Sequence, residues 1–189
     1  TGCVHAPNTA APVFTIQPSL GTCPSLWPPD HGYADFTIAD TGAIAEAVTG
    51  GCAVAAVSFI ACVSSQPENG TGVGDGNTTR DCVYETGALH LRAERDGACS
   101  PVGRVYSMQM VATDVCGNTT TSNSFDVAVW HDRGHQPTAG TIVSANPNSN
   151  TPDTRDGANG TYGASCGLGS SSANGTVRDD SDADPDNYG

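Results

Sequence analysis

Acidic side chains with the chemistry of calcium ligands gather in two segments of this chain. The segment from Glu68 to Asp81 reads ENGTGVGDGNTTRD, and the tail from Asp180 reads DSDADPD. Calcium takes about six to eight oxygen ligands from carboxylates, backbone carbonyls and water, so both segments are candidate calcium sites. Ordinary solvated turns are the alternative. The candidate ligands are Glu68, Asp75, Asn77 and Asp81 in the loop, Asp114 from a loop expected at the same end of the fold, and Asp180, Asp182 and Asp184 in the tail.

Other residue patterns do not indicate catalysis or a further cofactor. The tail lacks the glycine and the final glutamate of an EF-hand. His131, Asp132 and His135 have a spacing similar to metal ligands, but the start of a polar linker is the simpler interpretation. The GLGSS segment at 167–171 is not a G-x-S-x-G nucleophile motif, and no phosphate-binding glycine loop is present. We therefore expect a protein that is not an enzyme and has no catalytic residues.

The chain contains eight cysteines, an even number that predicts disulfides and an oxidising compartment. No two cysteines have the C-x-x-C spacing of a zinc site, and no C-x-x-C-H motif for covalent haem is present. We expect four disulfides, with Cys82 bonded to Cys99 across the LRAER segment. The cysteines are Cys3, Cys23, Cys52, Cys62, Cys82, Cys99, Cys116 and Cys166.

Charge and hydropathy exclude two classes of partner. The chain has 20 acidic residues against 7 basic residues, a formal net charge of −13, and its bases are all arginines. Such a chain is repelled by nucleic-acid phosphates and by anionic membrane surfaces. No apolar run approaches the ~20 residues of a membrane span. Because the chain begins at Thr1, we expect a mature secreted protein from which a signal peptide was removed, located outside the cell or at its surface.

Alternating apolar and polar residues predict β-strands, because successive side chains of a strand point to opposite faces. Leu89–Glu94 and Tyr106–Ala112 alternate strictly, and we expect them to pair as antiparallel strands around a long hairpin loop. The apolar run 52–64 predicts a buried central strand with a bend, and 43–48 predicts a short helix. Further strands are expected at 12–17, 33–39 and 124–130, so that about seven strands occur at the spacing of a sandwich.

Several motifs in this region resemble a known family. PSLWPPDH (24–31), SQPENGTGVGDGNTTRD (65–81), LRAER (91–95), GRVY (103–106) and ATDVCGN (112–118) occur in that order. Together they resemble the immunoglobulin-like, hyalin-repeat-like (HYR-type) domains of large secreted bacterial proteins, over roughly residues 12–132. The resemblance implies an immunoglobulin-like sandwich that serves as a spacer, an adhesive module or a surface-layer component.

The composition divides the chain into three parts. Residues 1–11 form a lead-in, 12–132 the predicted antiparallel immunoglobulin-like β-sandwich, and 133–189 an extended irregular arm rich in Gly, Ser, Asn and Asp. The arm cannot bury enough apolar surface to order itself, so we expect Cys166, bound ions or a neighbouring subunit to hold it. A terminus packed on its own domain is the alternative.

These features predict an all-β, non-catalytic structural subunit of an extracellular assembly such as a filament, a sheath or a surface layer. The arm would join copies into a homopolymer, with disulfides and calcium as stabilising elements. The alternative is a calcium-dependent adhesive or carbohydrate-binding module. Glycan attachment is predicted where the host has the machinery, at Asn69, Asn77, Asn118, Asn159 and Asn174.

Overall fold

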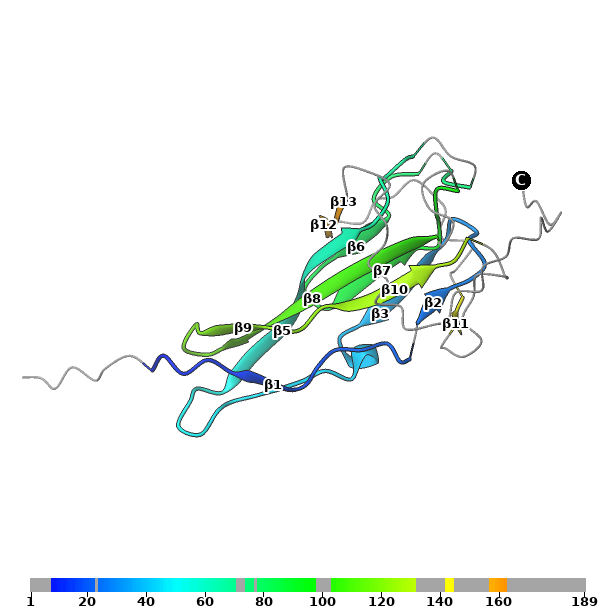
Figure 1. Cartoon of the computed structure of the whole chain (residues 1–189). Coiled ribbons are helices and arrows are strands. Elements are labelled where there is room, and N and C mark those ends of the chain that lie inside the picture. The colour runs from blue at the N-terminus through cyan, green and yellow to red at the C-terminus, as the bar shows by residue number, and fades with distance from the viewer. Residues whose placement is uncertain are drawn as a thin grey trace, which may run out of the picture.

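The protein is all-β, as predicted. The computed structural model describes residues 8–22, 24–70, 74–76, 78–97, 103–131, 142–144 and 157–162. In these ranges the chain forms β-strands and one short 3-10 helix, η1 (Ala39–Thr41). No helix within them is long and apolar enough to cross a membrane. The strands form two larger sheets and a small two-stranded ribbon (Figure 1).

The larger sheet is built around two long antiparallel strands, β5 (Val54–Ser64) and β8 (Arg104–Asp114). Its strand order is β11-β2-β10-β8-β5-β13, and β9 continues beyond β10 along the same side of β8. The remaining strands of this sheet are short: β2 (Ser25–Leu26), β9 (Thr119–Thr121), β10 (Phe125–Val129), β11 (Ile142–Val143) and β13 (Thr161–Tyr162).

The second sheet is antiparallel and has the order β12-β6-β7-β3. Its strands are β3 (Tyr33–Thr37), β6 (Cys82–Tyr84), β7 (Ala88–Arg92) and β12 (Ala158–Asn159). The ribbon pairs β1 (Val13–Ile16) with β4 (Ile44–Glu46). Figure 1 shows this ribbon beside the lower part of β5, away from β6 and β12.

The core lies between the two larger sheets, so the fold is a sandwich. Along β8 every second residue is buried, and Tyr106, Met108 and Met110 share one apolar cluster with Leu89 and Leu91 of β7. Removing these side chains from water is the main favourable contribution to folding. Trp130, which follows β10, is also buried.

Three predictions about local structure are wrong. β7 and β8 do not form a hairpin, because β7 pairs with β3 and β6 whereas β8 pairs with β5 and β10. Alternation identifies a half-buried strand but not its partner.

The segment 43–48 contains β4 instead of a helix, because a helix of six residues is not stable alone and the backbone of β4 pairs with β1. β5 is bent by two register shifts, as expected, but it is half exposed: Ile60 is 37% and Val63 is 47% exposed.

Two disulfides join described residues, Cys52–Cys116 and Cys62–Cys82. The predicted bond between Cys82 and Cys99 is therefore wrong. Cys82 begins β6 and faces β5 of the other sheet, where the Cα atom of Cys62 lies 6.5 Å away. Sequence proximity suggested a local bond, but the sandwich brings strands of opposite sheets together. The remaining cysteines, Cys3, Cys23, Cys99 and Cys166, lie outside the described residues.

Candidate functional site

The Cys62–Cys82 disulfide connects the two sheets on one side of the sandwich, where β5 of the larger sheet lies beside β6 of the second sheet. On this side β5 is the last long strand of the larger sheet, and β6 is the last strand of the second sheet before β12. The outer strand of a sheet exposes a row of N–H and C=O groups that can pair with further chain. The disulfide therefore holds two potential pairing edges close together.

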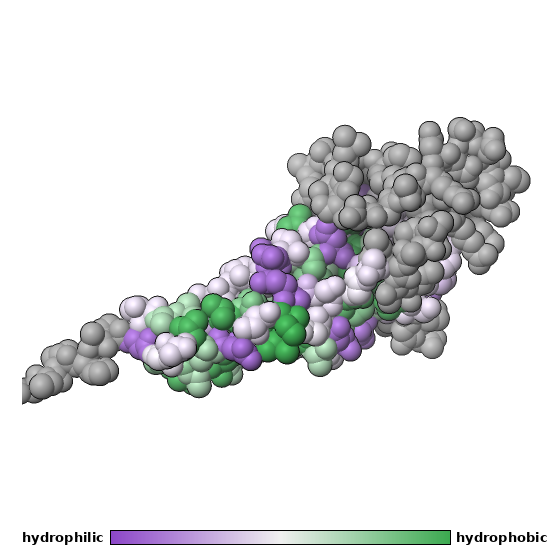
Figure 2. Space-filling model, turned by 60° about the horizontal axis from the view of Figure 1, so that its bottom comes forward, coloured by the Kyte–Doolittle hydropathy of each residue, from purple (hydrophilic) through white to green (hydrophobic). Residues whose placement is uncertain are grey.

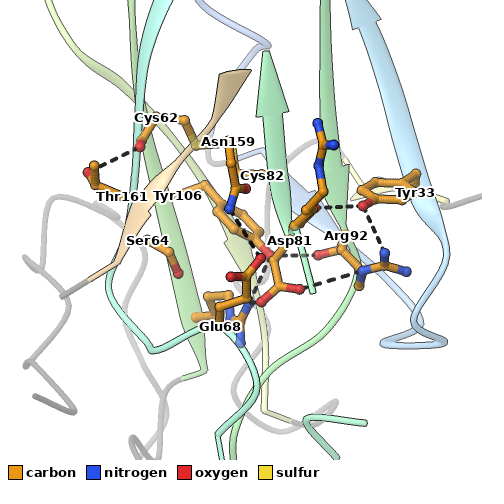
Figure 3. The surroundings of a disulfide bond; sticks show 12 residues. Tyr33, Cys62, Ser64, Glu68, Asp81, Cys82, Arg92, Tyr106, Asn159 and Thr161 are labelled. Carbon is orange, nitrogen blue, oxygen red and sulfur yellow. Dashed lines mark hydrogen bonds and ion pairs between the residues drawn. A yellow bond between two sulfur atoms is a disulfide. The ribbon is translucent and has the colours of Figure 1, made fainter. Parts of the chain in front are cut away.

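A single segment of the C-terminal region, which we call the strap (residues 157–162), pairs with both edges. Its β12 is antiparallel to β6, with Ala158 opposite Tyr84, and its β13 is parallel to β5, with Thr161 opposite Val63. Figure 1 shows β12 and β13 together beside β6, and Figure 3 shows Asn159 and Thr161 next to Cys62 and Cys82. The strap thus continues both sheets with six residues.

Two glycines allow the strap to approach this closely. The backbone N–H of Gly160 donates to the carbonyl of Cys82 at 2.7 Å. A Cβ atom at Gly160 would lie 3.0 Å from the Cys62 carbonyl oxygen and 3.1 Å from the Cys82 Cβ. A Cβ atom at Gly157 would lie 2.6 Å from the carbonyl oxygen of Tyr84. The sequence G-A-N-G therefore fits the two edges because glycine permits close backbone contact.

Side-chain contacts also fix the orientation of the strap on the two edges. Arg80 donates from Nη2 to the carbonyl of Gly157 at 2.8 Å, and Asn159 donates from Nδ2 to Glu68 Oε1 at 3.3 Å. Thr161 Oγ1 lies 3.5 Å from the Cys62 carbonyl oxygen (Figure 3). The side chains of Asn159 and Thr161 are themselves exposed. The edges thus recognise the strap mainly through backbone hydrogen bonds and glycine spacing.

Beneath the strap, the acidic loop is organised around a buried arginine. Arg104, the first residue of β8, donates from Nη2 to Asp75 Oδ1 at 2.7 Å and from Nη1 to Asp81 Oδ2. It also donates to the carbonyl of Pro67 at 3.0 Å, and Glu94 Oε1 lies 4.0 Å from Nη2. Arg104, Asp75, Asp81 and Glu94 are each 0% exposed. The guanidinium therefore lies among three carboxyl groups, and its single positive charge offsets only part of their negative charge.

Arg92 of β7 fixes the adjacent part of the loop. It donates to the carbonyl of His31 and to the hydroxyl of Tyr33, both at 2.8 Å, and to the carbonyl of Thr79 at 3.2 Å. Its guanidinium lies 4.1 Å from the centre of the Tyr33 ring, a cation–π distance. The arginines of LRAER and GRVY thus bind the loop to both sheets.

Burial of excess negative charge raises the pKa of two carboxyl groups in this cluster. Burial raises the pKa of Asp75 to about 6 and that of Asp81 to about 7, although Arg104 opposes both shifts. The hydrogen bond to Glu94 raises the pKa of His31, whose Nδ1 lies 3.1 Å from Glu94 Oε2. Burial also raises the pKa of the Tyr106 hydroxyl. Asp75 and Asp81 are therefore the carboxyl groups that take up protons near neutral pH.

The predicted calcium ligands are not brought together as expected. Asp75 and Asp81 bind Arg104, whereas Glu68 accepts a hydrogen bond from the strap. Asp114 lies at the far end of the 11-residue β8 from Arg104, not at the same end as the loop. There it accepts hydrogen bonds from the backbone N–H groups of Cys116 and Asn118. Within the described ranges no group of three His, Cys, Asp or Glu side chains is arranged to hold a metal ion.

The predicted glycosylation positions and the histidines after β10 do not share one site in the described residues. Asn69 is exposed, and the Nδ2 of Asn118 donates to the carbonyl of Asn8 and to Asp114. The carbonyl of His131 accepts a hydrogen bond from Arg95. The predicted positions that lie outside the described residues are Asn77, Asp132, His135, Asn174, Asp180, Asp182 and Asp184.

Sequence reasoning missed both the arginine-centred cluster and the strap. The sequence did not indicate that Arg92, Glu94 and Arg95 are buried, or that Arg92 binds the loop. The signal for the strap was the pair of glycines at 157 and 160, which a Gly-rich background conceals. Comparisons with protein-family models, with curated proteins and with solved structures found no match to this chain.

Proposed function

We propose that this protein is a non-catalytic structural subunit of an extracellular assembly, joined to its neighbours through the C-terminal arm. The observation that carries the proposal is the pairing of arm residues with sheet edges: β11 with β2, β12 with β6 and β13 with β5. Strand addition is a common way in which extended segments join protein modules. An arm that recognises sheet edges has the chemistry required to connect copies.

The disulfides support the extracellular part of the proposal. Cys52–Cys116 and Cys62–Cys82 close loops with sequence separations of 64 and 20 residues. Disulfides persist in oxidising environments outside the cytosol. They also suit a subunit that must remain folded outside the cell, because they restrict the unfolded chain. We also propose that the sandwich is of the immunoglobulin-like type and that calcium stabilises the assembly. Calcium would bind the tail carboxylates of Asp180, Asp182 and Asp184.

The surface of the described residues favours a structural subunit over a carbohydrate-binding module. A sugar-binding face typically presents aromatic rings, because their flat apolar surface stacks on sugar. The exposed large apolar side chains are all aliphatic in the described ranges: Val13, Ile16, Ile44, Ile60, Val63 and Val115. Figure 2 shows hydrophobic patches interspersed with polar residues on the described part of one face. Such aliphatic surface is better suited to packing against protein.

Deletion of residues 137–189 tests the proposal. We expect the full chain to form assemblies larger than a monomer at high concentration, and the shortened chain to stay monomeric. Near-UV circular dichroism and mapping of the two disulfides would establish that the sandwich is intact in both. A folded, shortened chain that still polymerised would overturn the role of the arm.

A further inference from the structure

Building on the proposed function, we propose that the strap is exchanged between copies: residues 157–162 of one chain dock on β5 and β6 of the next. The donor is the G-A-N-G-T-Y segment, and the acceptor is the pair of edges joined by Cys62–Cys82. This inference names the partner, a second copy of this chain, and the surface that receives it. A single chain fills its acceptor with its own strap.

The contacts themselves do not favour one arrangement over the other. The hydrogen bond from Gly160 to Cys82, the bond from Arg80 to Gly157 and the bond from Asn159 to Glu68 form equally well within a chain or between chains. The balance therefore depends on the linker and on protein concentration, as in other exchanged elements. Crowding of copies in an assembly favours exchange, whereas dilution favours the closed monomer.

The linker is long enough to reach a second chain. Strands β11 and β13 lie on opposite edges of the larger sheet, five strand intervals apart, which is about 24 Å at ~4.8 Å per interval. Residues 145–156 connect Ser144 to Gly157. An extended chain of that length spans about 43–47 Å. The linker therefore exceeds the distance that it must cover within one chain, and the surplus permits docking on a neighbour.

The donor and the acceptor are different surfaces, so exchange produces head-to-tail contacts when it is not reciprocal between two chains. The strap lies in the C-terminal region, whereas its acceptor consists of β5 and β6. Head-to-tail contacts that do not close a ring continue as open filaments. Because each copy carries a formal net charge of −13, neighbouring copies repel one another, and added salt screens that repulsion. Exchange should therefore increase with both protein concentration and ionic strength.

The variant Gly160→Val tests the exchange in the full chain. A Cβ atom at this position would meet Cys62 and Cys82 atoms at 3.0–3.3 Å, and valine adds two methyl groups to that contact, so the variant should donate its strap poorly but keep its acceptor. Alone it should stay monomeric, and mixed with wild type it should accept a strap and end each growing chain. The matched control is Ala158→Val, because Ala158 lies in the same segment and is exposed. This control variant should assemble as wild type does. Circular dichroism would verify that both variants are folded.

A synthetic peptide of residues 155–163 gives a second test that does not depend on the folding of a variant. Added in excess to wild type, it should occupy acceptors and reduce the mean length of assemblies, whereas the same peptide with valine at position 160 should have no effect. If wild type assembles but G160V assembles equally and the peptide does nothing, strap exchange is wrong and the proposed function stands. If wild type stays monomeric at every concentration and salt, the proposed function itself fails.

Discussion

The backbone N–H of Gly160 donates to the carbonyl oxygen of Cys82 at 2.7 Å, directly beside the disulfide that connects Cys82 to Cys62. At this point the two sheets and the arm are joined within a few residues. The disulfide fixes the distance between β5 and β6, and the strap requires that distance in order to pair with both. The covalent bond therefore positions the acceptor edges as well as stabilising the fold.

Loss of the Cys62–Cys82 bond should weaken both the fold and the strap. In the chain-entropy model its 20-residue separation is worth about 3 kcal/mol of unfolding free energy. We expect C62A/C82A to lose roughly that amount and to show faster hydrogen exchange at the Gly160 N–H, as measured by mass spectrometry. The matched control is C52A/C116A, whose 64-residue separation predicts a loss of about 4 kcal/mol without a specific effect at Gly160. Equal exchange at Gly160 in both variants would contradict a positioning role.

Replacement of Arg104 should destabilise the protein severely. Arg104→Met leaves Asp75, Asp81 and Glu94 buried without their central cation, and removing one partner of a buried ion pair costs about 3–5 kcal/mol. Arg104→Lys should recover only part of this loss, because an ammonium group cannot reproduce the planar fork of donors. Urea unfolding at pH 8 measures both. A change below about 1 kcal/mol for R104M would show that the cluster contributes little.

Stability should fall as the pH rises from 5.5 to 8. The folded pKa values of Asp75 and Asp81 are raised to about 6 and about 7, so the folded state binds more protons than the unfolded state above pH 4. The contribution of these bound protons to the free energy of unfolding is fully present below the pKa of the unfolded carboxyl groups. It is lost as the pH rises through the pKa values of the folded state. The raised pKa of His31 acts in the same direction. The slope is at most about 1.4 kcal/mol per pH unit for each proton.

Thermal unfolding across this pH range, compared between two variants, tests the assignment. Asp75→Asn should reduce the slope of melting temperature against pH. Asp40→Asn is the control, since the hydrogen bonds from Thr37 lower the pKa of Asp40 and keep it ionised throughout. A melting temperature that rose between pH 5.5 and 8, or a D75N slope equal to that of wild type, would show that these carboxyl groups stay ionised.

Much of the fold could be predicted from local patterns. Alternation in residues 106–112 predicts β8 correctly because one face of that strand is buried against Leu89 and Leu91. Pairing partners could not be predicted in the same way: the two best strands belong to different sheets, and Cys82 bonds to a residue of the opposite sheet. Both depend on contacts between distant segments.

The site was less predictable than the fold. Acidic residues among glycines have the composition of a calcium loop, and only the fold reveals that Arg104, distant in sequence, binds Asp75 and Asp81. Between Gly157 and Thr161 the strap carries one small apolar side chain, Ala158, which is too little to form a periodic pattern. It is defined by backbone pairing and by glycines at two close approaches, which become visible only when β5 and β6 lie side by side.

Electron microscopy of the purified full chain, over a series of concentrations with and without a calcium chelator, tests the central claim most directly. We expect regular filaments or sheets at high protein concentration and moderate salt, and a loss of these on chelation would place calcium at the contacts. Isolated single-chain particles under every condition would contradict a structural subunit and would favour a monomeric binding module, which glycan screening would then examine.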